Sequence, residues 1–414
     1  YSYIVIKKIM VKLFFPAFFM FYALYTTKLR SQGFIVSRKK KTAQKAVDCG
    51  VHASIFPLFL RFSMNEITTL SNVFQHHLSW DKRRCDFAAS YIIALLKVCT
   101  VNGIKIANAL DGKSKKESKY RRVQRFFAEF SFRGEDIARM LLALMPIPPP
   151  YILSLDRTEW HFGTVVFNIL VLGIVVEGTS MPLFWMMLPK AGNSRTSARQ
   201  KLLKRLLLVM PLSHIRHLVA DREFIGQHWF LFLGRRKIPL FVRLRANTVV
   251  DTLRGKQQIQ RALAWMQTGQ RIRGRFETEI YGARFYISVM RLEHDWCIIA
   301  HQQQTRNAFT LYQQRWTIET LFASLKSRGF HLEITHLNEP ARLWRLFALL
   351  AIALLWAYKC GLFLMKQKAI PLKKNGRLAH SITAYGLQEL QHSLLNSQYF
   401  RQVLISFLGL LSCT

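Results

Sequence analysis

Acidic residues are scarce in this chain, with 23 Asp and Glu against 60 Lys and Arg. The imbalance gives a formal charge of +37 and a pI of about 10.5 over 414 residues. Such an excess of positive charge indicates a polyanionic partner, with nucleic acid as the leading candidate, although net charge says nothing about fold. An acid that stands in apolar surroundings therefore needs an explanation.

Paired cysteine motifs are absent too. The six cysteines are scattered, with no Cys-x-x-Cys pair and no Cys/His cluster: Cys49, Cys85, Cys99, Cys297, Cys360 and Cys413. This spacing argues against a zinc module and a disulfide framework, and it fits a reducing cytoplasm. The chain is 50% hydrophobic and contains 31 Phe, which is enough to bury a core. This composition excludes a disordered basic tail.

Two hydrophobic runs raise the question of a membrane. The first, at 13–25, resembles a signal-peptide core but is short for a span, and no small-residue cleavage site follows it. The chain starts at Tyr1 and a helical pattern opens at Met64, so we interpret 1–63 as a non-core extension, with upstream translation favoured over targeting. The second run, at 343–365, could span a bilayer, but we favour a helix buried in a large core.

Residues 64–150 have the pattern of a helical domain that ends in a linker, "PIPPP" at 146–150. Within it, the stretch "KSKKESKYRRVQRFF" at 113–127 interleaves seven basic residues with aromatic ones. Such a charge run is often only a solvated face, but here the aromatic side chains could dock on the domain and leave a basic side for DNA phosphates. The candidate contacts are Lys119, Arg121, Arg122 and Arg125.

The pattern then becomes α/β. The stretches "YILSLD" (151–156) and "HIRHLVAD" (214–221) read as buried strands that each end in an aspartate. Open α/β sheets place their sites just outside such strand ends, although a single Asp after a strand more often begins a turn. Residues 246–308 alternate polar and apolar residues, which predicts a mostly β insertion before the next helix.

That helix carries a glutamate in apolar surroundings. At about 100° per residue, four polar side chains share one narrow stripe beside an apolar face: Tyr312, Arg315, Glu319 and Lys326. A surface ion pair between Arg315 and Glu319 would explain only two of the four. Together with Asp156 and Asp221, Glu319 could bind two Mg²⁺ ions for phosphodiester chemistry, because Mg²⁺ prefers oxygen ligands.

The blocks "LSLDRTEWHFG", "VADREFIG" and "YQQRWTIETLFASLK" resemble the three catalytic blocks of DDE transposases of the insertion-sequence-4 family, bacterial cut-and-paste enzymes. The third block matches that family's Y-x2-R-x3-E-x6-K signature, and the resemblance covers about 64–390. It implies a ribonuclease H-like α/β core (151–245 and 309–335) with a mixed sheet and flanking helices. The insertion 246–308 interrupts this core, the helical DNA-binding domain precedes it, and a helical region (336–414) follows.

By matching position, the resemblance makes Asp156, Asp221 and Glu319 the metal ligands, for Mg²⁺ or Mn²⁺. Tyr312, Arg315 and Lys326 would contact phosphates of the transposon end. A homodimer would act on paired ends, commonly through a hairpin intermediate in which a tryptophan holds a flipped base.

Several residue roles stay open in the sequence. Trp265 and Trp296 are both candidates for the base-holding tryptophan, and both could equally be core residues. Glu223 could support the site or merely start a helix. Glu159 is the nearby acid most easily mistaken for a ligand, and it should point away from the site if the Asp156 strand continues.

Three other interpretations belong to different classes. A ribonuclease H-like endonuclease without strand joining would share all three acids. A catalytically inactive DNA-binding relic would keep them without chemistry. A membrane protein would need the 343–365 helix to face lipid, which fits poorly with the aspartate-bearing strands. We expect a cytoplasmic, nucleoid-associated bacterial enzyme that catalyses hydrolysis and transesterification.

Overall fold

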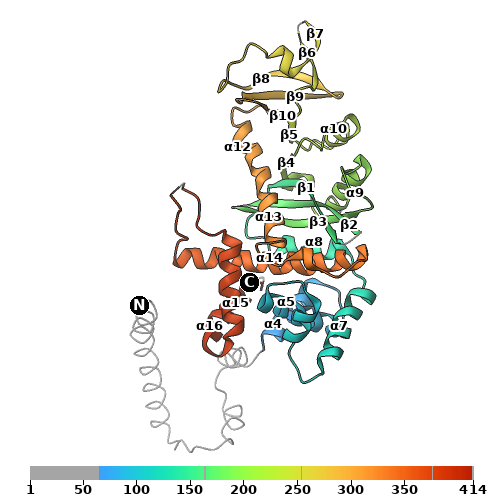
Figure 1. The fold of residues 1–414 in the computed structure, drawn as a ribbon, viewed down its shortest axis with the longest axis vertical. Coiled ribbons are helices and arrows are strands. Elements are labelled where there is room, and N and C mark those ends of the chain that lie inside the picture. The colour runs from blue at the N-terminus through green and yellow to red at the C-terminus, as the bar shows by residue number, and fades with distance from the viewer. Residues whose placement is uncertain (1–64, 163–164, 253, 375, 413–414) are drawn as a thin grey trace, which may run out of the picture. The chain divides into compact units, whose positions relative to one another are not determined.

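The computed structural model describes residues 65–162, 165–252, 254–374 and 376–412 (Figure 1). Residues from Asn65 onward form one compact unit. The interpretations of 1–63 as an extension and of 13–25 as a hydrophobic run lie outside the described residues.

The N-terminal part of this unit is helical, as the sequence predicts. Its helices are α4 (Glu66–His77), α5 (Lys82–Val98), α6 (Gly103–Ala109), α7 (Lys116–Glu129) and α8 (Gly134–Ala143). Asn65 and Asp81 cap α4 and α5 by accepting hydrogen bonds from backbone N–H groups of the first turn. Helix α7 buries Val123, Phe126 and Phe127, so its aromatic side docks on the domain. No helix or strand crosses the proline stretch 146–150.

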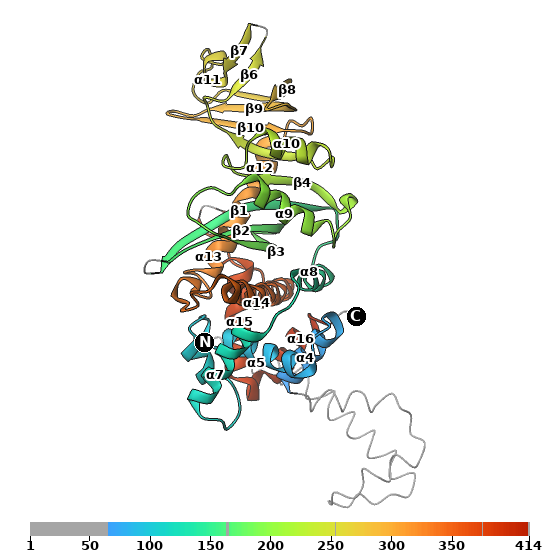
Figure 2. The same ribbon diagram turned by 90° about the vertical axis from the view of Figure 1, so that its right-hand side faces the viewer.

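An eight-stranded mixed sheet extends from α14 to the top of the unit in both views, in the order β3-β2-β1-β4-β5-β10-β9-β8 (Figures 1 and 2). Its strands are β1 (Tyr151–Phe162), β2 (Val165–Val176), β3 (Thr179–Leu188), β4 (Ile215–Ala220), β5 (Leu240–Leu244), β8 (Arg271–Ile280), β9 (Ala283–Arg291) and β10 (Trp296–His301). Strands β1, β2 and β3 are antiparallel, whereas β4 runs parallel to β1 and β5 parallel to β4. The sheet is therefore mixed, as expected for the α/β class that the sequence predicts.

One expectation about the strands needs correction. The first strand does not end at Asp156 but continues to Phe162, because its second half still pairs with β2 as far as Phe162 opposite Val165. The insertion 246–308 adds strands to the same sheet, since β10 pairs with β5. Only the hairpin of β6 (Val249–Thr252) and β7 (Gly255–Gln258) forms a second sheet among the described residues.

Helices cover both faces of the sheet. Helices α9 (Thr196–Leu206) and α10 (Gln227–Gly234) lie on one face, and α12 (Ala308–Gln313) and α13 (Thr317–Leu325) lie on the other (Figures 1 and 2). Right-handed crossovers account for the first pair, because β3-α9-β4 and β4-α10-β5 both progress across the sheet in one direction. Short helices connect other elements: α11 (Ile259–Ala262) and the 3-10 helices Leu212–His214 and Leu332–Ile334.

The C-terminal helices are α14 (Pro340–Gln367), α15 (Ile382–Leu395) and α16 (Ser397–Gly409). Helix α14 contains the long hydrophobic run, and by length and composition it could cross a membrane. In the structure, 83% of its most apolar window is buried, between the sheet and the helices α5, α7 and α15. This burial favours the interpretation of a core helix.

Helices α14 and α15 cross at two glycines. A Cβ atom on Gly386 would collide with the carbonyl oxygen of Ala357 and the backbone of Gly361. Gly386→Ala should therefore destabilise the fold by about 1–3 kcal/mol or more, as overpacking does, and thermal unfolding should show a lower Tm. Gly234→Ala is the matched control, because its Cβ would meet nothing within 4 Å. Equal Tm values for the two variants would contradict this crossing.

Candidate active site

The two aspartates are brought together by the parallel pairing of β1 and β4. The last paired residues of this register are Leu155 and Ala220, so Asp156 and Asp221 follow side by side. Each carboxylate is held by the next backbone N–H: Arg157 donates to Asp156 at 2.8 Å and Arg222 donates to Asp221 at 2.7 Å. Asp156 stays within β1, opposite Val171 of β2, but the β4 pairing of β1 ends at Leu155.

The predicted signature helix is not one continuous α-helix. A 3-10 turn, Gln314–Trp316, separates α12 from α13, and such a turn re-aims the side chains on either side of it. Glu319 lies in the first turn of α13, where the helix dipole favours a carboxylate. The predicted apolar face is present, since Ile318, Leu321, Phe322 and Leu325 are buried.

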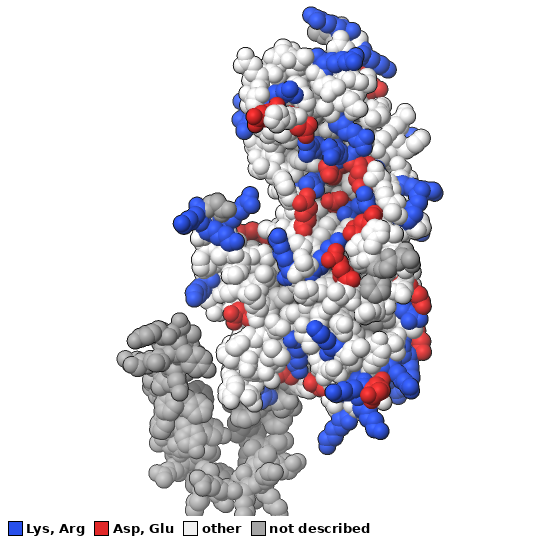
Figure 3. Space-filling model, viewed as in Figure 1, with Lys and Arg blue, Asp and Glu red and all other residues white. Residues whose placement is uncertain are grey.

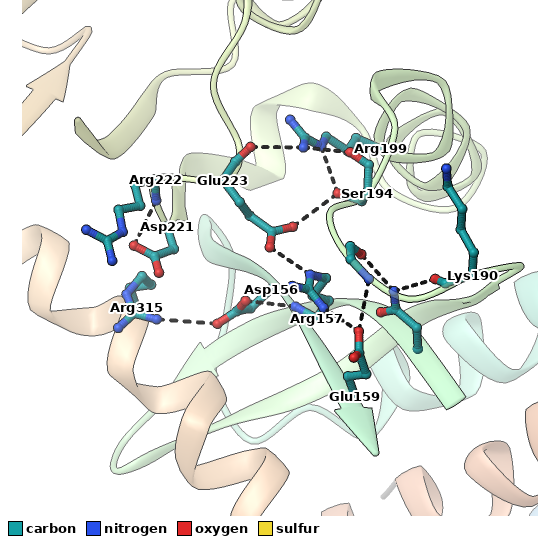
Figure 4. A network of polar contacts seen from close by, with 12 residues as sticks. Asp156, Arg157, Glu159, Lys190, Ser194, Arg199, Asp221, Arg222, Glu223 and Arg315 are labelled. Atoms are coloured by element: carbon teal, nitrogen blue, oxygen red, sulfur yellow. Dashed lines mark hydrogen bonds and ion pairs between the residues drawn. The ribbon is translucent and has the colours of Figure 1, made fainter. Parts of the chain in front are cut away.

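Arg315 joins the carboxylates from this turn. Its guanidinium lies 3.3 Å from Asp156 Oδ2 and 2.6 Å from Glu319 Oε1, and its side chain is only 12% exposed. Figure 4 shows it beside both Asp156 and Asp221. The contact with Glu319 is thus more than the surface pair that a helix spacing alone would give, because the arginine links one residue of the sheet to one of α13.

Asp156 lies in an environment that disfavours its charge. Burial raises its pKa to about 6, the Arg157 N–H and the Arg315 guanidinium act in the opposite direction, and the Asp221 and Glu223 carboxylates raise it further. An oxygen-rich site with mutually repelling carboxylates suits a hard divalent cation, so the donor set fits Mg²⁺. Among the described residues, however, no three His, Cys, Asp or Glu side chains form a ready metal site. The Arg315 guanidinium lies between the Asp156 and Glu319 carboxylates, where a metal ion bound by both would also lie.

The other two signature residues differ in what they contact. The Tyr312 hydroxyl donates to Asp221 Oδ1 at 3.4 Å. Lys326 is the C-cap of α13, donates to the Glu159 carbonyl oxygen and pairs with Glu333, both at 3.1 Å, and lies over the Trp160 ring. Lys326 therefore ties the end of α13 to β1, and within the described residues no hydrogen bond or ion pair joins it to the three carboxylates.

A second polar network lies beside the aspartates (Figure 4). The sequence did not indicate which of its residues pair. Arg157 pairs with Glu223 at 2.7 Å and with Glu159 at 3.0 Å. Glu223 also accepts from Ser194, and the buried Arg199 donates to the carbonyl oxygens of Ser194 and Glu223. Glu159 lies outside the carboxylate site, as predicted, and accepts the Gly192 N–H. The Arg157–Glu223 ion pair thus joins the residue after Asp156 to the segment that follows Asp221.

Tryptophan exposure separates the two candidates that the sequence left open. Trp296 is buried with Arg291 over its ring, whereas Trp265 is 67% exposed. Trp316, which the sequence analysis did not consider, is 64% exposed, and the Arg315 guanidinium lies 5.8 Å from the centre of its ring. It could have been noticed in the sequence as the aromatic residue directly after the signature arginine.

The basic stretch of α7 is not part of this site. Both views place α7 on the side of α14 away from the sheet (Figures 1 and 2). Arg121, Arg122 and Arg125 are exposed, with Arg122 over the Phe87 ring, while Lys119 donates to the Leu110 carbonyl oxygen. At the middle of the sheet, acidic side chains gather between basic ones (Figure 3).

Comparisons with known proteins give a match to a protein family and distant likenesses to several solved structures. The structure of a piggyBac transposase synaptic complex with hairpin DNA is similar at 11% identity, covering 85% of this chain and 84% of that chain with a TM-score of 0.40. A likeness this distant supports no inference about mechanism. No curated protein matches the chain.

The family model described as "Transposase DDE domain" matches residues 148–356, which span the sheet, the insertion and the signature helices. The match runs over half of the chain and includes both aspartates, the glutamate and Arg315. The chain belongs to this family of DDE transposase domains.

Proposed function

We propose that the protein is a cut-and-paste DNA transposase of the insertion-sequence-4 type, which cleaves at the terminal inverted repeats of its element and joins the ends to target DNA. The observation that carries the proposal is the convergence of Asp156, Asp221 and Glu319 on the Tyr312–Arg315 segment. A basic protein with an acidic centre combines attraction of DNA with a place for cations.

Each side chain has a distinct task in this proposal. Asp156, Asp221 and Glu319 hold the metal, and Arg315 releases the carboxylates when it pairs with a DNA phosphate, because a guanidinium binds phosphate through two parallel hydrogen bonds. The chemistry supplied by Mg²⁺ or Mn²⁺, with two ions in this proposal, is activation of a water or 3′-hydroxyl and stabilisation of the leaving oxygen. Tyr312 and Lys326 contact neighbouring phosphates.

The wider assembly is also part of the proposal. The exposed arginines of α7 contact the DNA backbone, a homodimer holds paired ends, and the enzyme acts in the bacterial cytoplasm on nucleoid DNA. If the reaction passes through a hairpin, Trp265 is the better candidate to hold a flipped base, because its ring is open to solvent whereas Trp296 is covered.

A strand-transfer assay tests the function. Precleaved duplexes that carry the repeats flanking the coding sequence are incubated with supercoiled plasmid and Mg²⁺. We expect joined products that depend on the 3′-hydroxyl of the repeat end and disappear with Asp221→Asn. Cleavage of the repeat without any joining would instead identify a nuclease.

The Arg157–Glu223 pair gives a prediction about positioning. Glu223→Gln should lower the cleavage rate about 10- to 100-fold through misplaced aspartates, while the Kd for repeat DNA and the Tm change little. Glu159→Gln is the matched control, because Glu159 pairs with the same arginine but lies outside the carboxylate site. Equal losses in both variants, or a loss that follows a lower Tm, would contradict a positioning role for Glu223.

A further inference from the structure

A cavity of about 220 Å³ lies between α13 and the start of α15. Polar side chains line it from both sides: Thr320, Ser324 and Arg328 from α13 and the turn after it, and His380, Ser381 and Thr383 from the α15 side. Apolar residues form the rest of the lining. Nothing in the proposed reaction uses this cavity.

The cavity lies beside α13, the helix that carries the glutamate. Thr320 directly follows Glu319, about 100° further around the helix axis, and Thr320 and Ser324 are one helical turn apart on the same face. Beyond the helix, the chain turns at Gly329, where a Cβ atom would collide with the carbonyl oxygen of Ser324. The cavity and Glu319 are therefore neighbours on one helix, on adjacent sides of it.

The charge of the cavity is positive. Arg328 and His380 are exposed, and the described residues contain no ion pair for either side chain. No acidic residue lines the cavity. The last turn of α14 and the segment between α14 and α15 add four exposed lysines, Lys366, Lys368, Lys373 and Lys374, and basic side chains gather over this segment in Figure 3.

A buried hydroxyl in the lining has no partner. Thr383 is 2% exposed, and its Oγ1 makes no hydrogen bond in the described structure. It lies in the first turn of α15, where Ser381 caps the helix by accepting from the Ala384 N–H. A free donor and a helix N-terminus beside two cationic side chains favour an anion with several acceptor oxygens.

We propose that this cavity binds a single phosphodiester group of the DNA strand that passes Glu319. Arg328 and His380 contact its oxygens at the mouth, and the Thr383 hydroxyl donates from within. The inference rests on the proposed function for the identity of the strand, but it concerns binding and not cleavage.

Methylphosphonate scanning tests the contact. Neutral linkages replace single phosphates one at a time along the flanking-repeat duplex, and the Kd of the full chain is measured in EDTA. At one linkage we expect about tenfold weaker binding by the wild type and a much smaller loss for Arg328→Gln, whose salt slope should also fall by about 1. Equal losses in both proteins at every linkage would overturn the proposal.

Two further variants separate this contact from general effects. Arg235→Gln removes one exposed positive charge at the C-cap of α10, a helix on the opposite face of the sheet from α13, and it should keep the linkage-specific loss of the wild type. Thr383→Val should weaken DNA binding with an unchanged or higher Tm, because it removes a hydroxyl without a partner. A lower Tm with unchanged DNA binding would give Thr383 a structural role and contradict the proposal.

The source of the phosphate is tested separately. Inorganic phosphate at millimolar concentration should compete only weakly with DNA and should not bind measurably by calorimetry. Tight binding of inorganic phosphate that Arg328→Gln abolishes would assign the cavity to a free anion and overturn the DNA contact. If repeat cleavage is never observed while the linkage-specific loss is present, the proposed function fails and the cavity proposal stands.

Discussion

Glu319→Gln should abolish cleavage of repeat DNA, with a loss of at least about three orders of magnitude in rate. The amide keeps the shape of the side chain and one acceptor for Arg315, but it removes the charge needed to hold a divalent cation. DNA binding should be retained or slightly stronger, because a negative charge near the phosphates is removed. Gel-shift titration and a labelled-strand cleavage assay on the same preparation measure the two effects.

Glu333→Gln provides the control for Glu319→Gln. Glu333 is also partly exposed and pairs with a signature residue, Lys326, but it lies outside the carboxylate site. Its loss should change the cleavage rate by less than about tenfold. Cleavage that survives in Glu319→Gln would remove Glu319 from the metal site.

Arg315→Gln should destabilise the DNA-free protein by about 3 kcal/mol at pH 8, because it leaves Asp156 buried without its cation. The effect should shrink at acid pH. The folded-state pKa of Asp156 is raised to about 6 from 3.8, so its charge costs stability in full above pH 6, and this cost falls as the pH drops from 6 to 3.8. Without Arg315 the pKa rises further, so the protonated acid forms more readily and needs no partner.

Magnesium distinguishes this effect from ordinary loss of packing. Because Mg²⁺ and the guanidinium compete for the same carboxylates, 10 mM Mg²⁺ should raise the Tm of Arg315→Gln more than the Tm of the wild type. Arg235→Gln, which changes an exposed arginine, should show neither the pH dependence nor the extra response to Mg²⁺. Equal Tm shifts in all three proteins would contradict the role assigned to Arg315.

Asp156, Asp221 and Glu319 could be named as candidate metal ligands from the sequence because their signals are local. A buried strand that runs into an aspartate, seen twice, and a glutamate on the polar edge of an amphipathic helix are patterns within about ten residues. The alignment of Asp156 with Asp221 depends instead on the β1–β4 register, which pairs residues 65 positions apart, as Leu155 with Ala220. Each aspartate could be named from the sequence, but the parallel pairing of β1 with β4, which brings the two together, could not be predicted.

Other features escaped prediction for different reasons. The Arg157–Glu223 pair joins residues far apart in sequence, and nothing near either residue indicates the other. The 3-10 turn between α12 and α13 is a local break without Pro or Gly, so periodicity alone extended one helix through it. The insertion 246–308 contains β6 to β10, and its attachment to β5 depends on pairing between distant strands.

Metal-dependent cleavage is the measurement that tests the central claim most directly. A labelled duplex carrying the flanking repeat is incubated with the full chain in Mg²⁺, in Mn²⁺ and in EDTA, beside the Asp156→Ala variant. We predict a cut at the boundary of the repeat with either metal, no cut in EDTA and no cut by the variant. Tight and specific binding without any cut would contradict the account, and so would a cut that survives in EDTA or in Asp156→Ala.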